Sequence, residues 1–188
     1  MNALKRQYLF CYQRKIRRNP GKIIQKKWGR QQMEAYFPMF INIAGQKILV
    51  VGAGTIATRR AEVLADFDAD VLVVAPDGTE RMRELEREGR VSWQRRLFAQ
   101  PDLEEVRMVV TATDDMELNN TVAAACRERK IPVNHAGDKA QSDFYFPGVA
   151  REGSVVVGVT ASGKDHRLAR KVTAGVREWL GEFLEENP

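Results

Sequence analysis

The hydrophobic positions of residues 46–137 form short continuous runs, and segments with helical spacing separate most of these runs. Five segments are strand-like, four as continuous apolar runs and 90–96 as a polar–apolar alternation: 46–52, 70–76, 90–96, 106–113 and 131–137. Continuous apolar runs of this length are typical of parallel strands that are covered on both faces. Apolar residues three and four positions apart predict helices at 55–66 and 114–129, and 77–89 is expected as a charged, solvent-facing helix that ends at Gly89. Strands that alternate with helices predict right-handed crossovers and a doubly wound parallel sheet.

The pattern changes after residue 142. Segments 143–150 and 154–161 are both strand-like, and only the turn Arg-Glu-Gly separates them, which predicts a hairpin. A long helix with an apolar stripe should follow, from about residue 165 to 184. This second part is too small to bury its own apolar surface, so it should pack on the sheet domain or on a second copy. We therefore expect a Rossmann-type sheet over 37–141 and a hairpin-plus-helix region over 142–188 that serves dimerisation and the substrate cleft.

The charge of the chain is unevenly distributed. The 188 residues carry a formal net charge of +5, but residues 1–36 hold ten cationic side chains against one acid, Glu34. That segment is therefore +9 and the remainder −4, which argues against nucleic-acid binding by the folded domain. The tail could be a basic arm for an acidic partner, a targeting peptide, a disordered extension, or a segment upstream of a true start at Met33. No apolar h-region follows its charges, so secretion is not expected.

The remaining composition indicates a cytoplasmic globular protein. Hydrophobic residues make up 44% of the chain and charged residues 29%. The longest apolar runs have strand length, so we expect no membrane span. The two cysteines form no CxxC pair, and with only two histidines in the chain the sequence offers no metal-ligand constellation.

A glycine turn follows the first strand and opens the first helix: Gly52-Ala53-Gly54-Thr55-Ile56-Ala57. Gly52 would permit the tight turn, Gly54 would let a pyrophosphate approach the backbone, and Ala57 would keep the helix close to the strand. The N–H groups of the first helical turn would then face the phosphates. The alternative is a tight strand–helix turn that binds nothing.

The acid that usually binds the cofactor ribose is missing at the end of the second strand. That strand ends at Pro76, and Asp77 is the first acid after it, so Asp77 or the backbone around Pro76 could hold the ribose. No arginine stands at the strand end to receive a 2′-phosphate, so the sequence favours NAD over NADP.

Longer motifs resemble a known family. The stretch "YFPMFINIAGQKILVVGAGTIATRRAEVL" is followed by "TATDDMELN", "PVNHAGDKAQSDFYFPG" and "VTASGKDHRLARKV", in the order found in precorrin-2 dehydrogenases and the N-terminal module of siroheme synthases. The resemblance implies oxidation of precorrin-2 to sirohydrochlorin, with hydride transfer to NAD⁺, in a homodimer. Some members also insert ferrous iron; since this chain ends after one long helix, we expect little or no ferrochelatase activity.

The resemblance also assigns residues to the cofactor. Thr55 and Ile56 match one NAD contact region, and Pro76 with Asp77 matches the second, so that the absence of the usual acid is a family trait. Thr111, Thr113 and Asp114 stand at the carboxyl end of the fourth strand, where ligands gather in open α/β sheets. Asn119 matches a family asparagine.

The chain departs from the family at the expected catalytic acid. The family pattern V-N-x-x-D places its Asp at position 137, which is glycine here, and the acid follows at Asp138. Asp138 could act as the base, His135 could take the proton instead, or water could take it. A non-catalytic NAD or tetrapyrrole sensor on the same fold is therefore the competing hypothesis.

The substrate of this family is a polycarboxylate, which predicts a cleft rich in cations and hydrogen-bond donors. The motifs place such groups after the fifth strand and around the start of the last helix. The expected substrate-binding residues are Asn134, Lys139, Ser162, Gly163, Lys164, His166, Arg167 and Arg170.

Overall fold

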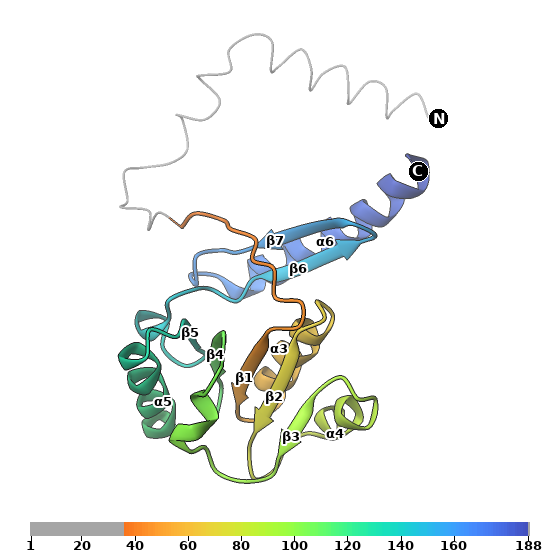
Figure 1. Cartoon of the computed structure of the whole chain (residues 1–188). Helices are drawn as coiled ribbons and strands as arrows, with labels where there is room; N and C mark the ends of the chain where they lie inside the picture. The colour runs from red at the N-terminus through yellow and green to blue at the C-terminus, as the bar shows by residue number, and fades with distance from the viewer. Residues whose placement is uncertain (1–35, 188) are drawn as a thin grey trace, which may run out of the picture. The chain divides into compact units, whose positions relative to one another are not determined.

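The computed structural model describes residues 36–187, and its centre is a five-stranded sheet (Figure 1). All neighbouring strands are parallel, in the order β3-β2-β1-β4-β5. The strands are β1 Lys47–Val51, β2 Asp70–Val74, β3 Ser92–Gln94, β4 Met108–Thr111 and β5 Val133–His135. The predicted Rossmann-type sheet is confirmed. The predictions for the basic tail lie outside the described residues.

Helices cover the two faces of this sheet. They are α3 Thr55–Ala65, α4 Glu80–Arg87 and α5 Met116–Glu128, with short 3₁₀ turns η1 Gln100–Leu103 and η2 Lys139–Gln141. The buried side chains of α3 and α4 pack on one face with Ile48 and Val110, and those of α5 pack on the other with Leu49 and Val109. Adjacent residues of β1 and β4 thus point to opposite layers, which explains why these strands are continuously apolar.

The helix starts follow local capping chemistry. Thr79 accepts a hydrogen bond from Met82 N at the start of α4, and Asp115 accepts one from Leu118 N at the start of α5. Both caps place the preceding loop at the carboxyl edge of the sheet.

The second part of the chain is a hairpin packed on a helix (Figure 1). Strands β6 Gly148–Glu152 and β7 Val155–Val159 pair antiparallel, and α6 His166–Glu186 packs on β6. A Cβ at Gly148 would lie 2.2 Å from Oγ1 of Thr173, so only glycine permits this approach of α6 to the strand. The hairpin and the long helix are confirmed.

Residues 143–147, expected as part of the first hairpin strand, do not belong to it. The backbone N–H of Asp143 donates to Val133 O at 2.8 Å, and its carboxylate accepts from Val133 N at 2.9 Å. Asn134 Nδ2 donates to Phe144 O at 2.7 Å. Because these groups bind β5, the segment follows the edge of the sheet, and Phe144 and Phe146 pack on the core layer of α3.

One face of α6 stays uncovered. Leu168, Val172, Trp179 and Phe183 are exposed and lie at helical spacing, and the rings of Trp179 and Phe183 stack at 5.1 Å between centroids. Such a stripe usually marks a surface that packs against another molecule.

Candidate functional site

A cleft of about 500 Å³ opens at the carboxyl ends of β1, β2 and β4. This is the switch point of the sheet, where the chain order reverses between β1 and β4 and where open α/β sheets bind ligands. Its walls come from the glycine turn, the loop after β2, the loop after β3 and the turn after β4: 51–54, 74–79, 96–98, 112–115 and Leu118.

Gly52 is required by the protein itself. Its φ is +106°, which L side chains rarely adopt, and an added Cβ would lie 2.5 Å from the carbonyl oxygen of Ala112. The residue therefore lets the ends of β1 and β4 approach each other, and Ala112 N donates to Val51 O at 2.9 Å across this contact. The predicted role of Gly52 in a tight turn agrees with this geometry.

Gly54 presents the opposite case, because nothing in the protein requires a glycine there. Its φ of −72° suits any residue, and an added Cβ would meet no atom of the described chain within 4 Å. The position opens onto the cleft at the N-terminus of α3, whose first turn holds no acid and whose N-cap provides no side-chain bond. Thr55 and Ile56 are exposed on the same turn.

These features fit the pyrophosphate of a dinucleotide. The N–H groups of a first helical turn have no intrahelical acceptors, and the helix dipole favours an anion beside them. Residues that would compete for those N–H groups, a capping side chain or a carboxylate, are absent from this turn of α3. Gly54 would therefore hold the phosphates through backbone groups rather than through a cationic side chain.

The loop after β2 is locked onto the glycine turn, a feature that the sequence motifs did not reveal. Thr79 N donates to Ala53 O at 3.0 Å, and the hydroxyl groups of Thr58 and Thr79 lie 2.8 Å apart. A Cβ at Gly78 would lie 2.5 Å from Cβ of Ala53 and 2.9 Å from the ring of Trp93. The two walls that would hold the phosphates and the ribose are thus one rigid unit.

Asp77 stands at the rim of the cleft. Its Oδ1 accepts hydrogen bonds from Gly78 N at 2.7 Å and from Arg83 Nη2 at 2.6 Å, and its side chain is 84% exposed. Pro76 is exposed beside it and also lines the cleft. Asp77 therefore presents a carboxylate where the sequence predicted a ribose contact.

The sequence places no arginine at the end of β2, but two arginines from elsewhere in the chain reach this region. Arg83 arrives from α4, and Arg96, in the loop after β3, lines the cleft. Each is paired: Arg83 with Asp77, and Arg96 with Asp102 through two bonds of 2.8 and 2.5 Å. Burial by itself would raise the pKa of Asp102, but the bonds from Arg96 and from Ala99 N outweigh it and lower that pKa.

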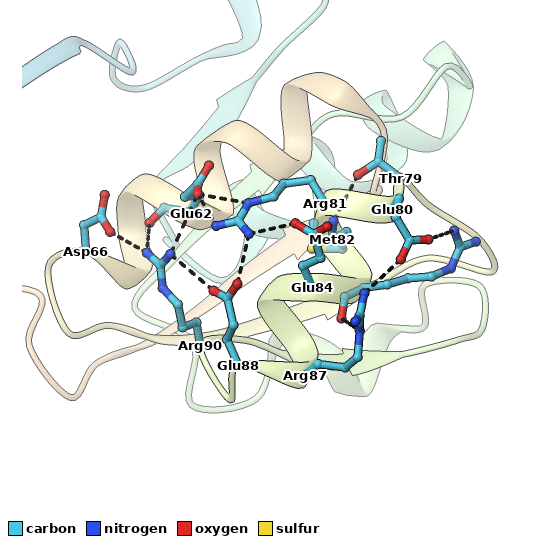
Figure 2. A network of polar contacts seen from close by, with 11 residues as sticks. Glu62, Asp66, Thr79, Glu80, Arg81, Met82, Glu84, Arg87, Glu88 and Arg90 are labelled. Atoms are coloured by element: carbon cyan, nitrogen blue, oxygen red, sulfur yellow. Dashed lines mark hydrogen bonds and ion pairs between the residues drawn. The ribbon is translucent and has the colours of Figure 1, made fainter.

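A wider ion-pair network fixes α4 to α3 (Figure 2). Arg81 bonds to Glu62 on α3 at 2.6 Å and to Glu84 and Glu88 on its own helix at 2.9 and 3.0 Å. These acceptors raise the pKa of Arg81 above its ordinary value. Surface ion pairs contribute little individually, and the pair between Arg81 and Glu62 is the contact of this network that joins α4 to α3.

The turn after β4 is built around Asn119. Its Oδ1 accepts from the Thr111 hydroxyl at 2.5 Å and from Thr113 N at 3.1 Å, and its Nδ2 donates to Thr113 O at 2.9 Å. Thr111 is fully buried beneath the cleft, whereas Thr113 and Asp114 line it. Asn119 thus shapes the wall that carries two of the predicted cofactor residues.

His135 has both ring nitrogens engaged. Nδ1 accepts hydrogen bonds from the N–H groups of Gly137 at 3.2 Å and Asp138 at 2.9 Å, and Nε2 lies 3.2 Å from Oδ1 of Asn120. Since Nδ1 accepts, these partners assign the ring proton to Nε2, which donates to the amide oxygen. The side chain is buried and holds the turn that presents Asp138.

The two candidate acid positions differ in their surroundings. Asp138 is half-buried at the start of η2, and its Oδ1 accepts from Ala140 N at 2.9 Å. A Cβ at Gly137 would lie 2.8 Å from Cε of Met116. An acid at position 137, as in the family, would therefore require the exposed side chain of Met116 to move aside.

The predicted substrate residues fall into two groups. The first group lies where the loop before α6 packs against η2. A Cβ added at Gly163 in that loop would lie 3.1 Å from Cε1 of Tyr145 and 3.5 Å from Cδ of Lys139. Ser162, half-buried, and Lys164, exposed, flank this contact. The other cations, His166, Arg167 and Arg170, are exposed on the first two turns of α6.

Asn134 belongs to neither group. It is buried, with Nδ2 bonded to Phe144 O, while Oδ1 has no partner among the described residues. The structure therefore places this predicted substrate residue inside the protein, under the segment that leads to the hairpin.

No cluster of three or more His, Cys, Asp or Glu side chains within 36–187 could hold a metal ion. In the same part of the chain, every helix is too short or too polar to cross a membrane.

Residues 39–148 match the model of the family described as "Putative NAD(P)-binding". The chain belongs to this family. The NAD(P)-binding family region spans the complete sheet, the glycine turn and the cleft described above. Family membership therefore identifies a nicotinamide dinucleotide as the cofactor class.

Individual proteins similar to this chain include members of the family that the sequence motifs resemble. Siroheme synthase of Pseudomonas entomophila is 37% identical over 77% of this chain, and siroheme synthase 1 of Serratia proteamaculans is 32% identical over 80% of it. The aligned parts cover 31% and 32% of those proteins, so the chain spans about a third of the relatives it matches. The solved structure titled SirC, precorrin-2 dehydrogenase, aligns over 76% of this chain and 70% of its own, with a TM-score of 0.62 and 26% identity. The resemblance read from the motifs is confirmed.

Proposed function

We propose that the chain binds NAD in the cleft and oxidises precorrin-2 to sirohydrochlorin. The observation that carries the proposal is the open position at Gly54, above a helix N-terminus with neither cap nor acid. The similarity to a structure titled precorrin-2 dehydrogenase and to siroheme synthases supports the substrate.

When bound, NAD⁺ supplies the hydride acceptor. The protein would position the cofactor: the turn at Gly54 would hold the phosphates, and Asp77 would accept a hydrogen bond from a ribose hydroxyl. Thr113 and Asp114, on the wall shaped by Asn119, would then confine the nicotinamide end of the cleft.

The proton released in the oxidation needs an acceptor, and we assign it to Asp138. Of the two residues suggested by the sequence, His135 has its ring nitrogens bonded to the turn and to Asn120, so it acts as a positioning residue. Asp138 Oδ1 accepts one backbone bond and Oδ2 accepts none from the described residues. A carboxylate of this kind can take a proton directly or through water.

The polycarboxylate substrate would lie against the contact between η2 and the loop before α6. Lys139 lies beside Gly163 there, and Ser162 and Lys164 flank Gly163 in the sequence. Charge-assisted bonds from these groups suit the side-chain carboxylates of a tetrapyrrole. His166, Arg167 and Arg170 extend the cationic surface along α6.

The apolar stripe of α6 supports a homodimer. Leu168, Val172, Trp179 and Phe183 leave an exposed apolar face that a second copy would cover isologously. A cytoplasmic location, the separation into domains at residue 141 and the absence of nucleic-acid partners stay predictions.

An anaerobic assay with purified protein, precorrin-2 and NAD⁺ tests the proposal through the absorbance of NADH. We expect enzyme-dependent NADH formation that Asp138→Asn reduces and that the matched control Glu117→Gln, an exposed acid on α5, leaves unchanged. NAD binding without turnover would replace this function by the sensor hypothesis. Incubation with sirohydrochlorin and ferrous iron shows separately whether iron is inserted.

A further inference from the structure

Three arginines belong to the elements that flank the cleft beyond β2. Arg83, Arg95 and Arg96 come from α4 and from the loop after β3, and each is neutralised by a carboxylate. Arg95 bonds to Glu86 at 2.6 and 2.9 Å, and Arg96 bonds to the buried Asp102. Glu86 lies on α4 and Asp102 in η1, and neither of these acids lines the cleft.

Arg83 differs because its neutralising acid is itself a cleft residue. Its Nη2 lies 2.6 Å from Oδ1 of Asp77, and its Nη1 lies 3.3 Å from Glu80. Glu80 is shared, since it also pairs with Arg87 at 2.8 Å one turn further along α4 (Figure 2). The guanidinium of Arg83 is therefore held at the rim mainly by Asp77.

The carboxylate of Asp77 keeps one face available. Both of its hydrogen bonds go to Oδ1, and Oδ2 accepts none from residues 36–187. With 84% of the side chain exposed at the cleft, Oδ2 can accept a hydrogen bond from a ligand hydroxyl. A ligand phosphate at the same place would instead meet a negative charge.

We propose that Asp77 and Arg83 form a charge pair that selects NAD against NADP, with Arg83 as a masked phosphate-binding group. The proposal rests on the proposed function, because it assumes a nicotinamide dinucleotide in this cleft. With Asp77 ionised, the ribose 2′-hydroxyl finds an acceptor and the charge of Arg83 is cancelled. Without the carboxylate, Arg83 would face the 2′-phosphate, which a planar guanidinium binds through two parallel hydrogen bonds.

The test is a cycle of variants measured by calorimetric titration with NAD⁺ and with NADP⁺. Asp77→Asn keeps an acceptor for Gly78 N and removes the charge, and Asp77→Ala removes both. We expect each to bind NADP⁺ about tenfold more tightly than the wild type, a change of about 1.4 kcal/mol, with NAD⁺ binding unchanged or weaker. Adding Arg83→Gln should abolish the gain for NADP⁺.

The matched control is Arg87→Gln, which removes the same charge from the same helix and from the same acid, Glu80, but does not touch Asp77. It should leave the ratio of the two dissociation constants unchanged in the wild type and in Asp77→Asn. Melting curves of all variants check the fold, and the high exposure of Asp77 predicts little change.

Three results would overturn the inference. NADP⁺ could bind the Asp77 variants no better than the wild type, the gain could survive Arg83→Gln, or Arg87→Gln could abolish it equally. A wild-type chain that binds neither dinucleotide would instead refute the proposed function.

Discussion

The two glycines of the turn should respond in opposite ways to the same added methyl group. In Gly52→Ala the new Cβ would lie 2.5 Å from Ala112 O and 2.9 Å from Ala112 C, and both are backbone atoms that cannot rotate away. In Gly54→Ala the new Cβ meets nothing within 4 Å, and the backbone already suits alanine. The first change should therefore damage the protein, and the second should damage only the ligand site.

The magnitudes follow from the local geometry. For Gly52→Ala, the left-handed backbone at φ +106° costs about 1–2 kcal/mol and the forced separation of β1 from β4 about 1–3 kcal/mol more. A loss of about 3 kcal/mol lowers the Tm of a chain of this size by about 6–12 °C. For Gly54→Ala, a weaker N-cap and a less flexible unfolded chain offset each other, so stability should change by less than about 1 kcal/mol.

The assay combines thermal unfolding with NAD⁺ titration on both variants. Gly54→Ala should keep the wild-type Tm within about 4 °C and bind NAD⁺ at least about tenfold more weakly, because the methyl group occupies the approach of the pyrophosphate. Gly52→Ala should lose stability first. Wild-type NAD⁺ affinity in Gly54→Ala, at unchanged stability, would refute the placement of the phosphates.

Three further changes test other parts of the site. Asn119→Ala leaves the buried Thr111 hydroxyl without its acceptor, so we expect a loss of about 1–3 kcal/mol in urea unfolding together with weaker NAD⁺ binding; unchanged stability would contradict the role of Asn119. Because its folded pKa is depressed, Asp102 contributes stability that is present above its ordinary pKa of 3.8 and lost as pH falls through the lower folded value. Acid unfolding of Asp102→Asn should show a shallower pH dependence in that range than the wild type; an identical slope would contradict the pairing with Arg96. Trp179→Arg on α6 should convert the proposed homodimer to a monomer in sedimentation experiments, and a dimer that persists would move the interface elsewhere.

The alternation of apolar runs and helical spacing was sufficient to predict the sheet. Each strand of the sheet lies within the range expected for it: four of them are continuous apolar runs, as buried parallel strands require, and β3 at the sheet edge alternates. The start of the hairpin was misplaced at residue 143 because the aromatic residues there have strand propensity. Asp143 and Phe144 instead bond to β5, and sequence periodicity carries no information about that partner.

In the candidate site, the sequence identified several residues whose surroundings only the structure shows. Gly52 and Gly54 were identified together by spacing, but only the structure separates them, since one faces Ala112 and the other faces the cleft. His135 was a candidate base by residue type, and the tertiary structure engages both ring nitrogens. No sequence motif indicated that Gly78 packs on Ala53.

By itself, the sequence determined the fold class, the position of the glycine turn and the family, because these depend on local conformational preference and on the order of motifs along the chain. Only the tertiary structure decided which charges the cleft presents. Arg83 and Arg96 reach the rim from α4 and from the loop after β3, and their pairing with Asp77 and Asp102 depends on distances that exist only after the sheet and helices have packed. Electrostatic interactions fall off with separation in space and not along the chain, so the charge pattern around a ligand is a property of the folded protein.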